Sequence, residues 1–423
     1  MQFFRALLLA APLAGALRLD RRGKVSYDGY KIFRVASEFA DAVEAELEGL
    51  EALHLMRTAQ HFDVAVPPES IDSFHALNVV AEVVSEDIGA DIALEGELTP
   101  YSSPVQQLDV GAAAVPDPSW FEAYHSYADH LTFLSDLQAA FPDNSEIYES
   151  GTSFEGREIT GIHLWGSAGK GSNPAINFHG TVHAREWITT MVNEYIAWQL
   201  VVGYGNDTSV KAYLDNYDFY ITPVVNPDGF VYTQTSNRLW RKNRQTRSGT
   251  SAIGTDVNRN WPYEWEGQGS STSPSSETYR GEEAGDTPEN LGLRTLTDDL
   301  ASGQGLKLYI DWHSYSQLIL LPYGYSCSAR AANIDEQIDL AGGVASAIAA
   351  PYGTQFEYGP TCETIYQTNG GSNDYIQDVS GAEFAWAIEL RDTGRNGFVL
   401  PPEQIIPSGF EAWQGVKNLL DSF

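Results

Sequence analysis

Several stretches of this chain are apolar at most consecutive positions rather than at every second one. The clearest are 175–178, 219–225, 306–312 and 384–390. An unbroken apolar run predicts a strand covered on both faces, because alternation is expected only where one face meets water. Segments with helical periodicity, above all 187–202 and 334–350, lie between these runs. The pattern predicts an α/β sheet sandwiched by helices, which binds ligands where its strands end.

A smaller acidic unit precedes this region. Residues 37–98 contain 15 acidic residues and one basic residue, Arg57. Together with the stretch just before it, the segment predicts strands and helices that alternate as a small α+β sandwich: strand 30–35, helix 38–50, strand 62–66, helix 71–77 and strand 79–84. From 99 to 118 the chain turns to Pro, Ser, Ala and Gly without periodicity, as linkers do.

The N-terminal sequence indicates the cellular compartment in which the protein acts. Residues 1–16 combine one arginine, a short apolar run and small residues at 14–16, which is typical of a secretory signal peptide. No later stretch is long and apolar enough to span a bilayer. We therefore expect a secreted, extracellular protein with a signal peptide at 1–16, an acidic α+β unit at 17–98, a linker at 99–118 and a large domain at 119–423.

Charge and cysteine content exclude several classes of partner and cofactor. With 57 acidic against 25 basic residues, the net charge of −32 argues against nucleic acid or an anionic membrane as partner. Two cysteines exclude a disulfide scaffold and iron–sulfur ligation. In a secreted protein Cys327 and Cys362 are either a disulfide that closes a loop of 35 residues or two buried thiols.

Three residues with metal-binding chemistry follow the predicted strands. His183 and Glu186 stand three apart after the strand at 175–178, and such a pair can point at one metal ion. His313 ends another predicted strand. The spacing of His183 and Glu186 alone also arises by chance, and His313 alone fits a buried, hydrogen-bonded imidazole. Together, two histidines and one glutamate leave a zinc position open for water, as in catalytic sites.

Acidic and basic residues nearby have functional and structural interpretations. Glu389 lies inside an apolar strand, where an unpaired carboxylate is costly. It is therefore either a catalytic base or the ion-pair partner of Arg391, which is two residues away and on the same face. Arg185, Arg241 and Arg259 lie near predicted strand ends, and each is either a surface salt bridge or a clamp for a free carboxylate.

With these residues the sequence resembles the A/B subfamily of zinc metallocarboxypeptidases, which are secreted as proenzymes. The resemblance covers about 119–423 and rests on ordered motifs at 183–187, 226–230, 237–242, 256–261, 276–279, 313–317, 365–367 and 389–394. It implies a mixed eight-stranded sheet sandwiched by helices, preceded by a small α+β, ferredoxin-like prodomain that the acidic unit resembles more loosely.

The resemblance also implies residue roles. His183, Glu186 and His313 hold one Zn²⁺, Glu389 is the general base, and Arg241 polarises the scissile carbonyl. The residues implied in substrate binding are Asn258, Arg259 and Tyr366 for the terminal carboxylate, with Arg185, Ser314 and Tyr315 at neighbouring subsites. Non-proline cis bonds are implied at Ser314-Tyr315 and Arg391-Asp392.

Departures from the family pattern affect specificity. Ala252 and Ser275 stand where a family disulfide is found, whereas Cys327 and Cys362 look like a pair present in some members. Asn373 takes the place that floors the specificity pocket, and Asp311 is expected near its wall. A neutral floor favours aromatic or aliphatic C-terminal residues, with a preference for Lys or Arg as the alternative. A small-molecule deacylase and a non-catalytic binding protein are further alternatives.

Processing is constrained by the distribution of basic residues. None occurs between Arg57 and Arg157, so a trypsin-like protease has no site in the linker, and the Arg21-Arg22 pair precedes the first predicted strand of the acidic unit, so that a cut there would not release it. We expect an activating protease of apolar or acid-tolerant specificity to cut within 99–118, and we expect the enzyme to act as a monomer on peptide and protein C-termini.

Overall fold

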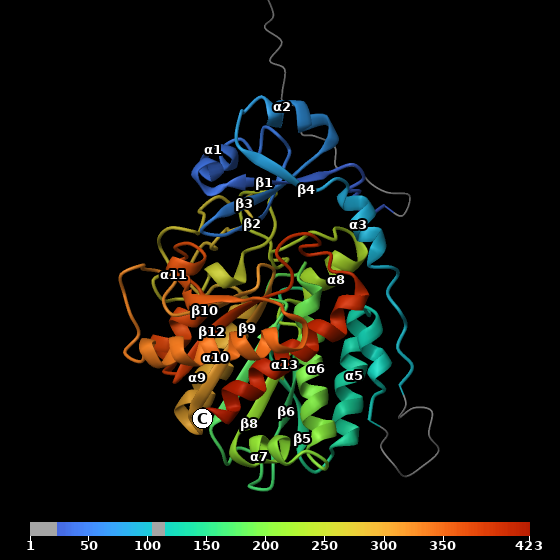
Figure 1. Ribbon diagram of the computed structural model, residues 1–423, viewed down its shortest axis with the longest axis vertical. Coiled ribbons are helices and arrows are strands. Elements are labelled where there is room, and N and C mark those ends of the chain that lie inside the picture. The colour runs from blue at the N-terminus through green and yellow to red at the C-terminus, as the bar shows by residue number, and fades with distance from the viewer. Residues whose placement is uncertain (1–22, 104–114) are drawn as a thin grey trace, which may run out of the picture.

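The computed structural model describes residues 23–103 and 115–423 (Figure 1). The predicted signal peptide and part of the predicted cleavage region lie outside these residues. Within them the strands form two sheets, a four-stranded one in the order β2-β3-β1-β4 and an eight-stranded one in the order β11-β10-β12-β9-β7-β8-β6-β5. Both sheets belong to the fold class that the sequence predicts.

The smaller sheet belongs to the N-terminal unit, which is defined here as residues 23–98. Its elements follow a β-α-β-β-α-β order: β1 (Lys31–Ala36), α1 (Ala40–Glu44), β2 (Leu53–Arg57), β3 (His61–Val66), α2 (Ile71–His75) and β4 (Ala81–Ser85), followed by α3 (Ile88–Leu94). The ladders β1–β3, β1–β4 and β2–β3 are antiparallel. Phe33 of β1 and Phe62 of β3 pack in the core of this unit with Phe74 of α2.

Two elements of this unit were not predicted. The expected helix at 38–50 is shorter, and β2 and α3 are additional. In β2 the consecutive residues Leu55 and Met56 are both buried, at 4% and 8% exposure. The register with β3 shifts between His54 and Met56, and Leu55 and Met56 both pack in one cluster with residues of the large domain. The irregularity removes the alternation that would mark this strand in the sequence.

The larger sheet is mixed, as predicted. Its strands are β5 (Ser145–Thr152), β6 (Glu158–Leu164), β7 (Ala175–Gly180), β8 (Asp218–Thr222), β9 (Leu306–Ser314), β10 (Leu318–Leu321), β11 (Glu357–Pro360) and β12 (Phe384–Leu390). The central strands β8, β7, β9 and β12 are parallel to their neighbours in that group. Strands β6 and β10 pair antiparallel to β8 and β12.

Helices cover both faces of this sheet (Figure 1). They are α5 (Tyr127–Ala140), α6 (Trp187–Gly203), α7 (Thr208–Asn216), α8 (Pro227–Thr235), α9 (Pro288–Gly303), α10 (Ile334–Tyr352), α11 (Thr361–Thr364), α12 (Ser372–Tyr375) and α13 (Ile405–Asp421). Phe178, Ile310 and Ile388 pack with α5, α6, α10 and α13, while Tyr309 and Ala385 pack with α9 and α12. Because strand residues alternate, His313 and Glu389 share the face of Tyr309 and Ala385.

The N-terminal unit packs on the large domain through an apolar cluster. Leu55 and Met56 of β2 join Leu320, Ala387 and Phe398 of the large domain in this cluster. Leu320 and Ala387 are register partners on β10 and β12. Strand β2 therefore lies against the end of the sheet at which the predicted functional residues gather.

Candidate active site

The loop between β7 and α6 brings His183 and Glu186 to one point. Thr181, in this loop, has a φ of 54°, the left-handed region that few residues other than glycine adopt. Its amide donates to the Thr189 hydroxyl at 2.8 Å, and the Ala184 amide donates to the Arg241 carbonyl at 2.9 Å. The first turn of α6 and a distant loop thus hold a conformation that short-range preferences disfavour.

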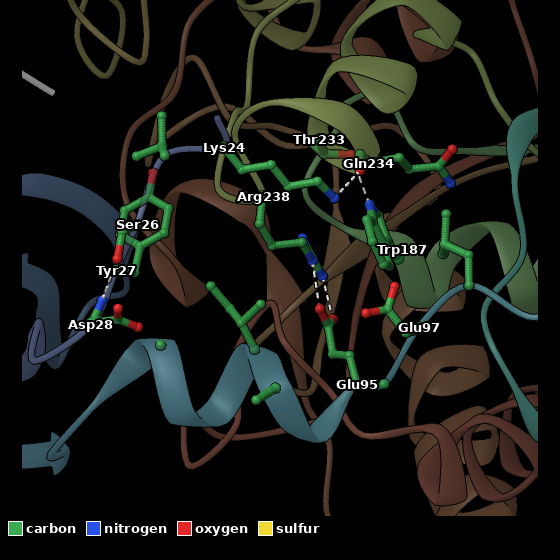
Figure 2. Close-up of a pocket in the computed structure, with 16 residues that line it drawn as sticks. Lys24, Ser26, Tyr27, Asp28, Glu95, Glu97, Trp187, Thr233, Gln234 and Arg238 are labelled. Atoms are coloured by element: carbon green, nitrogen blue, oxygen red, sulfur yellow. Dashed lines mark hydrogen bonds and ion pairs between the residues drawn. The ribbon is translucent and has the colours of Figure 1, made fainter. Parts of the chain in front are cut away.

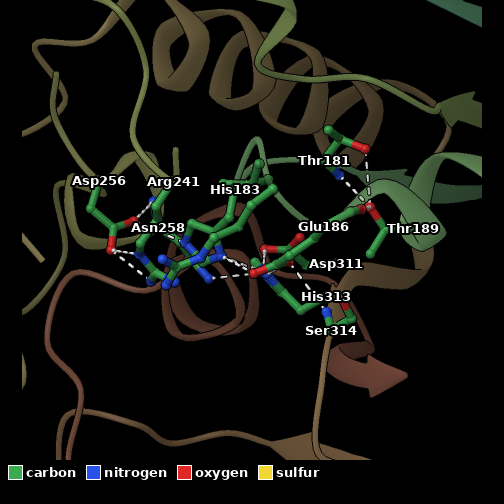
Figure 3. A network of polar contacts seen from close by, with 12 residues as sticks. Thr181, His183, Glu186, Thr189, Arg241, Asp256, Asn258, Asp311, His313 and Ser314 are labelled. Atoms are coloured by element: carbon green, nitrogen blue, oxygen red, sulfur yellow. Dashed lines mark hydrogen bonds and ion pairs between the residues drawn. The ribbon is translucent and has the colours of Figure 1, made fainter. Parts of the chain in front are cut away.

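His183, Glu186 and His313 converge in the structure (Figure 3). The Nδ1 atoms of the two histidines lie 3.1 Å apart. One oxygen of Glu186 lies 2.8 Å from His183 Nδ1 and the other lies 3.1 Å from His313 Nδ1. All three residues are buried, with exposures of 4%, 2% and 2%. Burial raises the pKa of Glu186, but His183 and His313 more than offset this and hold the pKa below its ordinary value.

These three side chains fit a zinc ion. Two Nδ1 atoms that face each other at 3.1 Å cannot both carry a proton, and a cation between them uses both lone pairs. Zinc–nitrogen bonds in a tetrahedral site place two ligand atoms about 3.3 Å apart, close to the spacing present here. The ligand set leaves one tetrahedral position open, as catalytic zinc sites do.

A buried carboxylate stands behind each imidazole. Asp256 Oδ1 lies 3.0 Å from His183 Nε2, and Asp311 Oδ2 lies 3.0 Å from His313 Nε2. The other oxygen of Asp256 accepts two hydrogen bonds from Arg241, at 2.8 and 3.1 Å. Although burial opposes it, Arg241 and His183 hold the pKa of Asp256 well below its usual value.

Glu389 stands beside the three ligands, and no ion pair ties it to another of the described residues. It is the register neighbour of His313 across the β12–β9 ladder, its exposure is 9%, and its Oε2 makes no hydrogen bond. Burial, with repulsion from Glu186, raises the pKa of Glu389 to about 8. Arg391 instead forms a two-bond ion pair with Glu411, at 2.6 and 2.7 Å, so the structural interpretation of Glu389 as its partner is wrong.

One cavity connects these groups with the predicted carboxylate clamp. It has a volume of about 60 Å³ with the N-terminal unit in place. Its lining includes His183, Glu186, His313, Glu389, Arg241, Asn258, Arg259, Ser314, Tyr366, Asn373 and, from the N-terminal unit, Met56. Arg259 donates to the Tyr366 hydroxyl at 2.9 Å, and the carbonyl of Asn258 accepts from Arg259 at 2.8 Å.

Comparison with known proteins identifies this arrangement. The zinc carboxypeptidase family model matches residues 130–415. The chain belongs to the zinc carboxypeptidase family. It is 49% identical to a metallocarboxypeptidase A-like protein of Trichophyton verrucosum over 98% of this chain and 97% of that one. It is 44% identical to metallocarboxypeptidase A of Arthroderma otae over the same shares.

The solved structure of thrombin-activatable fibrinolysis inhibitor is similar to this carboxypeptidase over both units. It matches with a TM-score of 0.82 and 25% identity, covering 94% of this chain and 99% of that one. The family establishes that the chain is a zinc metallocarboxypeptidase, and the fold predicted from the sequence is confirmed.

Other predicted site residues of the carboxypeptidase lie outside the cavity. Arg185 is 1% exposed and donates to the Leu55 carbonyl of β2 at 2.9 Å. The Tyr315 hydroxyl donates to Asp63 at 2.9 Å, also in the N-terminal unit. Asp311 is fully buried behind His313 and does not line the pocket near which it was expected.

The predicted covalent and backbone features of the carboxypeptidase are present. Cys327 and Cys362 form a disulfide, as the resemblance implies. The bonds Ser314-Tyr315 and Arg391-Asp392 are cis, and so is Pro322-Tyr323, which was not anticipated.

The sequence interpretation missed the roles of Asp256, Asp63 and Glu95. Ligand chemistry predicts that a metal-binding imidazole has a carboxylate behind it. With 57 acidic residues in the chain, however, only the folded structure shows which ones stand there. Asp63 and Glu95 act across the contact between the two units, and nothing in their local sequence distinguishes them from the acidic residues around them.

Proposed function

We propose that this chain is the proenzyme of a secreted zinc carboxypeptidase that removes apolar C-terminal residues from peptides and proteins. The observation that supports it most is the single cavity that contains the three metal-binding side chains, an unpaired buried glutamate and an arginine–asparagine–tyrosine clamp. One zinc ion suffices, because all three ligand atoms lie within 4.8 Å of one another. One chain also provides every group of the site, so a monomer suffices for activity.

Glu389 moves the proton in this reaction. Zinc bound to His183, Glu186 and His313 supplies Lewis-acid activation of a water molecule and of the scissile carbonyl. In its ionised form Glu389 accepts a proton from the attacking water as the water oxygen bonds to the carbonyl carbon. It then gives that proton to the amide nitrogen as the carbon–nitrogen bond breaks, so the products are a shortened peptide and a free amino acid.

Arg241 stabilises the charge that develops on the carbonyl oxygen. Its Nε and Nη2 are held by Asp256, so the guanidinium is oriented before substrate arrives and Nη1 remains for the oxyanion. Arg259, Asn258 and Tyr366 bind the terminal carboxylate of the substrate. A peptide without that carboxylate leaves the buried Arg259 unpaired, which favours cleavage at free C-termini.

The pocket beyond the clamp is suited to an apolar side chain. Among the described residues its lining includes Leu320, Ile365, Ala387 and the neutral Asn373, whose amide donates to the Thr361 hydroxyl at 3.0 Å. Within 23–103 and 115–423, the carboxylates that line the cavity are Glu186 and Glu389, which the mechanism uses. A lysine or arginine side chain would therefore be buried without a counter-charge, which is costly.

The N-terminal unit acts as an inhibitory prodomain. Met56 lines the cavity from the side of the N-terminal unit, and the His54 and Leu55 carbonyls of β2 accept hydrogen bonds from Arg185. Tyr315 is held by Asp63, which in turn accepts two hydrogen bonds from Arg34, at 2.8 and 2.7 Å. A peptide cannot reach the clamp while β2 stays in place, so activation requires removal of residues 17–98.

Cleavage takes place in the linker beyond its first residues. The amide of Thr99 donates to the Tyr124 carbonyl at 2.9 Å, and Tyr101 and Ser103 both donate to Asp136 at 2.9 Å, so the linker begins attached to the large domain. Sequencing the N-terminus of the active secreted protein tests this proposal. A mature chain that starts at Gly23, just after the dibasic pair, contradicts it.

Secretion is supported by the signal-like N-terminus and by the disulfide between Cys327 and Cys362. Across residues 23–103 and 115–423, none of the helices has the length and apolar content that crossing a bilayer requires.

A peptide panel on the activated enzyme tests the activity and the preference together. Matched peptides ending in Phe, Leu, Lys or Arg, each with a free or amidated C-terminus, are incubated with the enzyme and the released amino acids are measured. We expect release of Phe and Leu from the free acids and none from the amides. Faster release of Lys and Arg refutes the pocket assignment, and equal cleavage of the amides refutes the clamp.

A further inference from the structure

A second buried carboxylate stands behind the metal-binding site. Tyr309, Asp311 and His313 alternate along β9 and share one face of the sheet. His179 is the register partner of Asp311 on β7. Asp311 and His179 are both fully buried, with 0% exposure. A polar row therefore runs through the sheet from Tyr309 to the metal ligand His313.

The contacts of Asp311 join this row to His313. Its Oδ2 lies 3.0 Å from His313 Nε2 (Figure 3). The same oxygen accepts a hydrogen bond from the Ser372 hydroxyl at 2.7 Å. Its Oδ1 lies 3.4 Å from His179 Nδ1, and the opposite nitrogen of that ring lies 2.5 Å from the Tyr309 hydroxyl. Ser372 thus holds the carboxylate by a hydrogen bond, whereas His179 lies beside its other oxygen without forming one.

Asp311 differs from Asp256, the carboxylate behind the other histidine. The charge of Asp256 is shared with Arg241 at 2.8 Å. In the part of the chain that the structure describes, the ion-pair contacts of Asp311 are to His179 and His313 alone. A buried carboxylate with no arginine or lysine beside it is costly unless a cation lies close by.

The protonation of His313 decides whether its Nε2 accepts a hydrogen bond from Asn258 or donates one to Asp311. The Asn258 amide nitrogen also lies 3.1 Å from this atom. When Nδ1 binds a metal, Nε2 carries the proton of the ring and must donate it. The Asn258 amide nitrogen cannot accept that proton, whereas Asp311 Oδ2 can. Metal binding therefore selects the contact between His313 and Asp311.

We propose that Asp311 is a positioning residue that orients His313, makes its Nδ1 a stronger donor and so increases the affinity of the site for zinc. The proposal rests on the metal site of the proposed function. The buried charge of Asp311 is compensated chiefly by the ion beyond His313, so this carboxylate stabilises the metal-loaded protein much more than the metal-free one. Loss of such a carboxylate weakens metal binding by about 10- to 100-fold in other sites.

Substitution of Asp311 by Asn in the full chain tests this. Zinc affinity is measured by competition with a chromophoric chelator, and thermal midpoints are measured with and without zinc. We expect Asp311→Asn to weaken zinc binding about 10- to 100-fold and to lower the midpoint of the zinc-loaded protein, while the midpoint of the zinc-free protein changes little. Ser372→Ala, which removes only one hydrogen bond to the carboxylate, should weaken zinc binding less.

Asp218→Asn is the matched control. Asp218 is also fully buried in this sheet, and it lies 2.9 Å from a histidine, His163, that is not part of the metal site. This variant should lower both midpoints together and leave zinc affinity unchanged.

An Asp311→Asn protein that binds zinc as tightly as the parent, or whose two midpoints fall together, overturns the proposal. If that variant does not fold, unchanged zinc affinity in Ser372→Ala overturns it instead. A parent protein that itself fails to bind zinc refutes the proposed function as well, which separates the two failures.

Discussion

Removal of the Glu95 carboxylate should loosen the N-terminal unit from the large domain. Glu95 follows α3, and its two oxygens accept hydrogen bonds from Arg238 at 2.6 and 2.7 Å (Figure 2). The two side chains are only 3% and 7% exposed. Arg238 belongs to the large domain, so this buried ion pair ties the two units together at a place separate from the cavity.

The size of the effect depends on the contacts that Arg238 retains when the Glu95 carboxylate is removed. Removing one partner of a buried ion pair costs about 3–5 kcal/mol. In Glu95→Gln the guanidinium still donates to the carbonyls of Arg185 and Phe398, at 2.8 and 2.7 Å, and it still stacks on the Trp187 ring at 3.9 Å. The amide oxygen of Gln also replaces one acceptor, so we expect a loss of about 2–3 kcal/mol. That loss corresponds to an increase of about 30- to 150-fold in the fraction of molecules whose N-terminal unit has detached from the large domain.

The assay measures peptide hydrolysis by the intact chain. The activity of the uncleaved Glu95→Gln protein should rise by this factor, up to the activity of the cleaved enzyme as a ceiling. Mass spectrometry confirms that the linker is uncut. The matched control is Glu86→Gln, which breaks the exposed ion pair of Glu86 with Lys31 in the same unit, where side-chain exposures are 74% and 32%. Exposed pairs contribute about 0–1 kcal/mol, so this control should change little.

Two results refute the reasoning. If uncleaved Glu95→Gln is no more active than the parent, the ion pair does not hold the two units together. If Glu86→Gln activates the chain equally, the effect reflects a general loss of acidic charge rather than loss of the buried pair.

Three further predictions concern the large domain. Glu389→Gln should lower the turnover of the activated enzyme at least about 100-fold while zinc affinity measured by chelator competition is kept, and parental turnover in this variant contradicts the assignment of the base. Chelation of zinc should abolish peptide hydrolysis and addition of zinc should restore it, so activity that survives complete metal removal, verified by elemental analysis, contradicts the mechanism. Asp374 is buried, and burial raises its pKa from 3.8 to about 7. A carboxyl whose pKa is raised on folding stabilises the protein fully below pH 4, and this contribution is lost as pH rises through about 7. The thermal midpoint should therefore fall between pH 5 and pH 8 by more in the parent than in Asp374→Asn, and equal falls would contradict this.

The main strands and the metal ligands were predictable for local reasons. Unbroken apolar runs mark β7, β9 and β12, because a strand covered on both faces has no polar side. His183, Glu186 and His313 were predictable because they follow such runs, at the edge of the sheet where ligands bind. Strand β2 was not predictable, because its buried residues Leu55 and Met56 pack against residues of the large domain that lie far along the chain.

The sequence by itself determined which strands form the centre of the larger sheet and which residue types end them, since hydrophobic periodicity and side-chain chemistry are local properties. Only the tertiary structure decided which charged side chains pair with one another. Arg391 pairs with Glu411 and leaves Glu389 free, and Asp311 turns to His313 rather than to the pocket. The physical reason is distance. Charges and hydrogen bonds act over a few ångströms in space, and only the folded chain settles which side chains approach that closely.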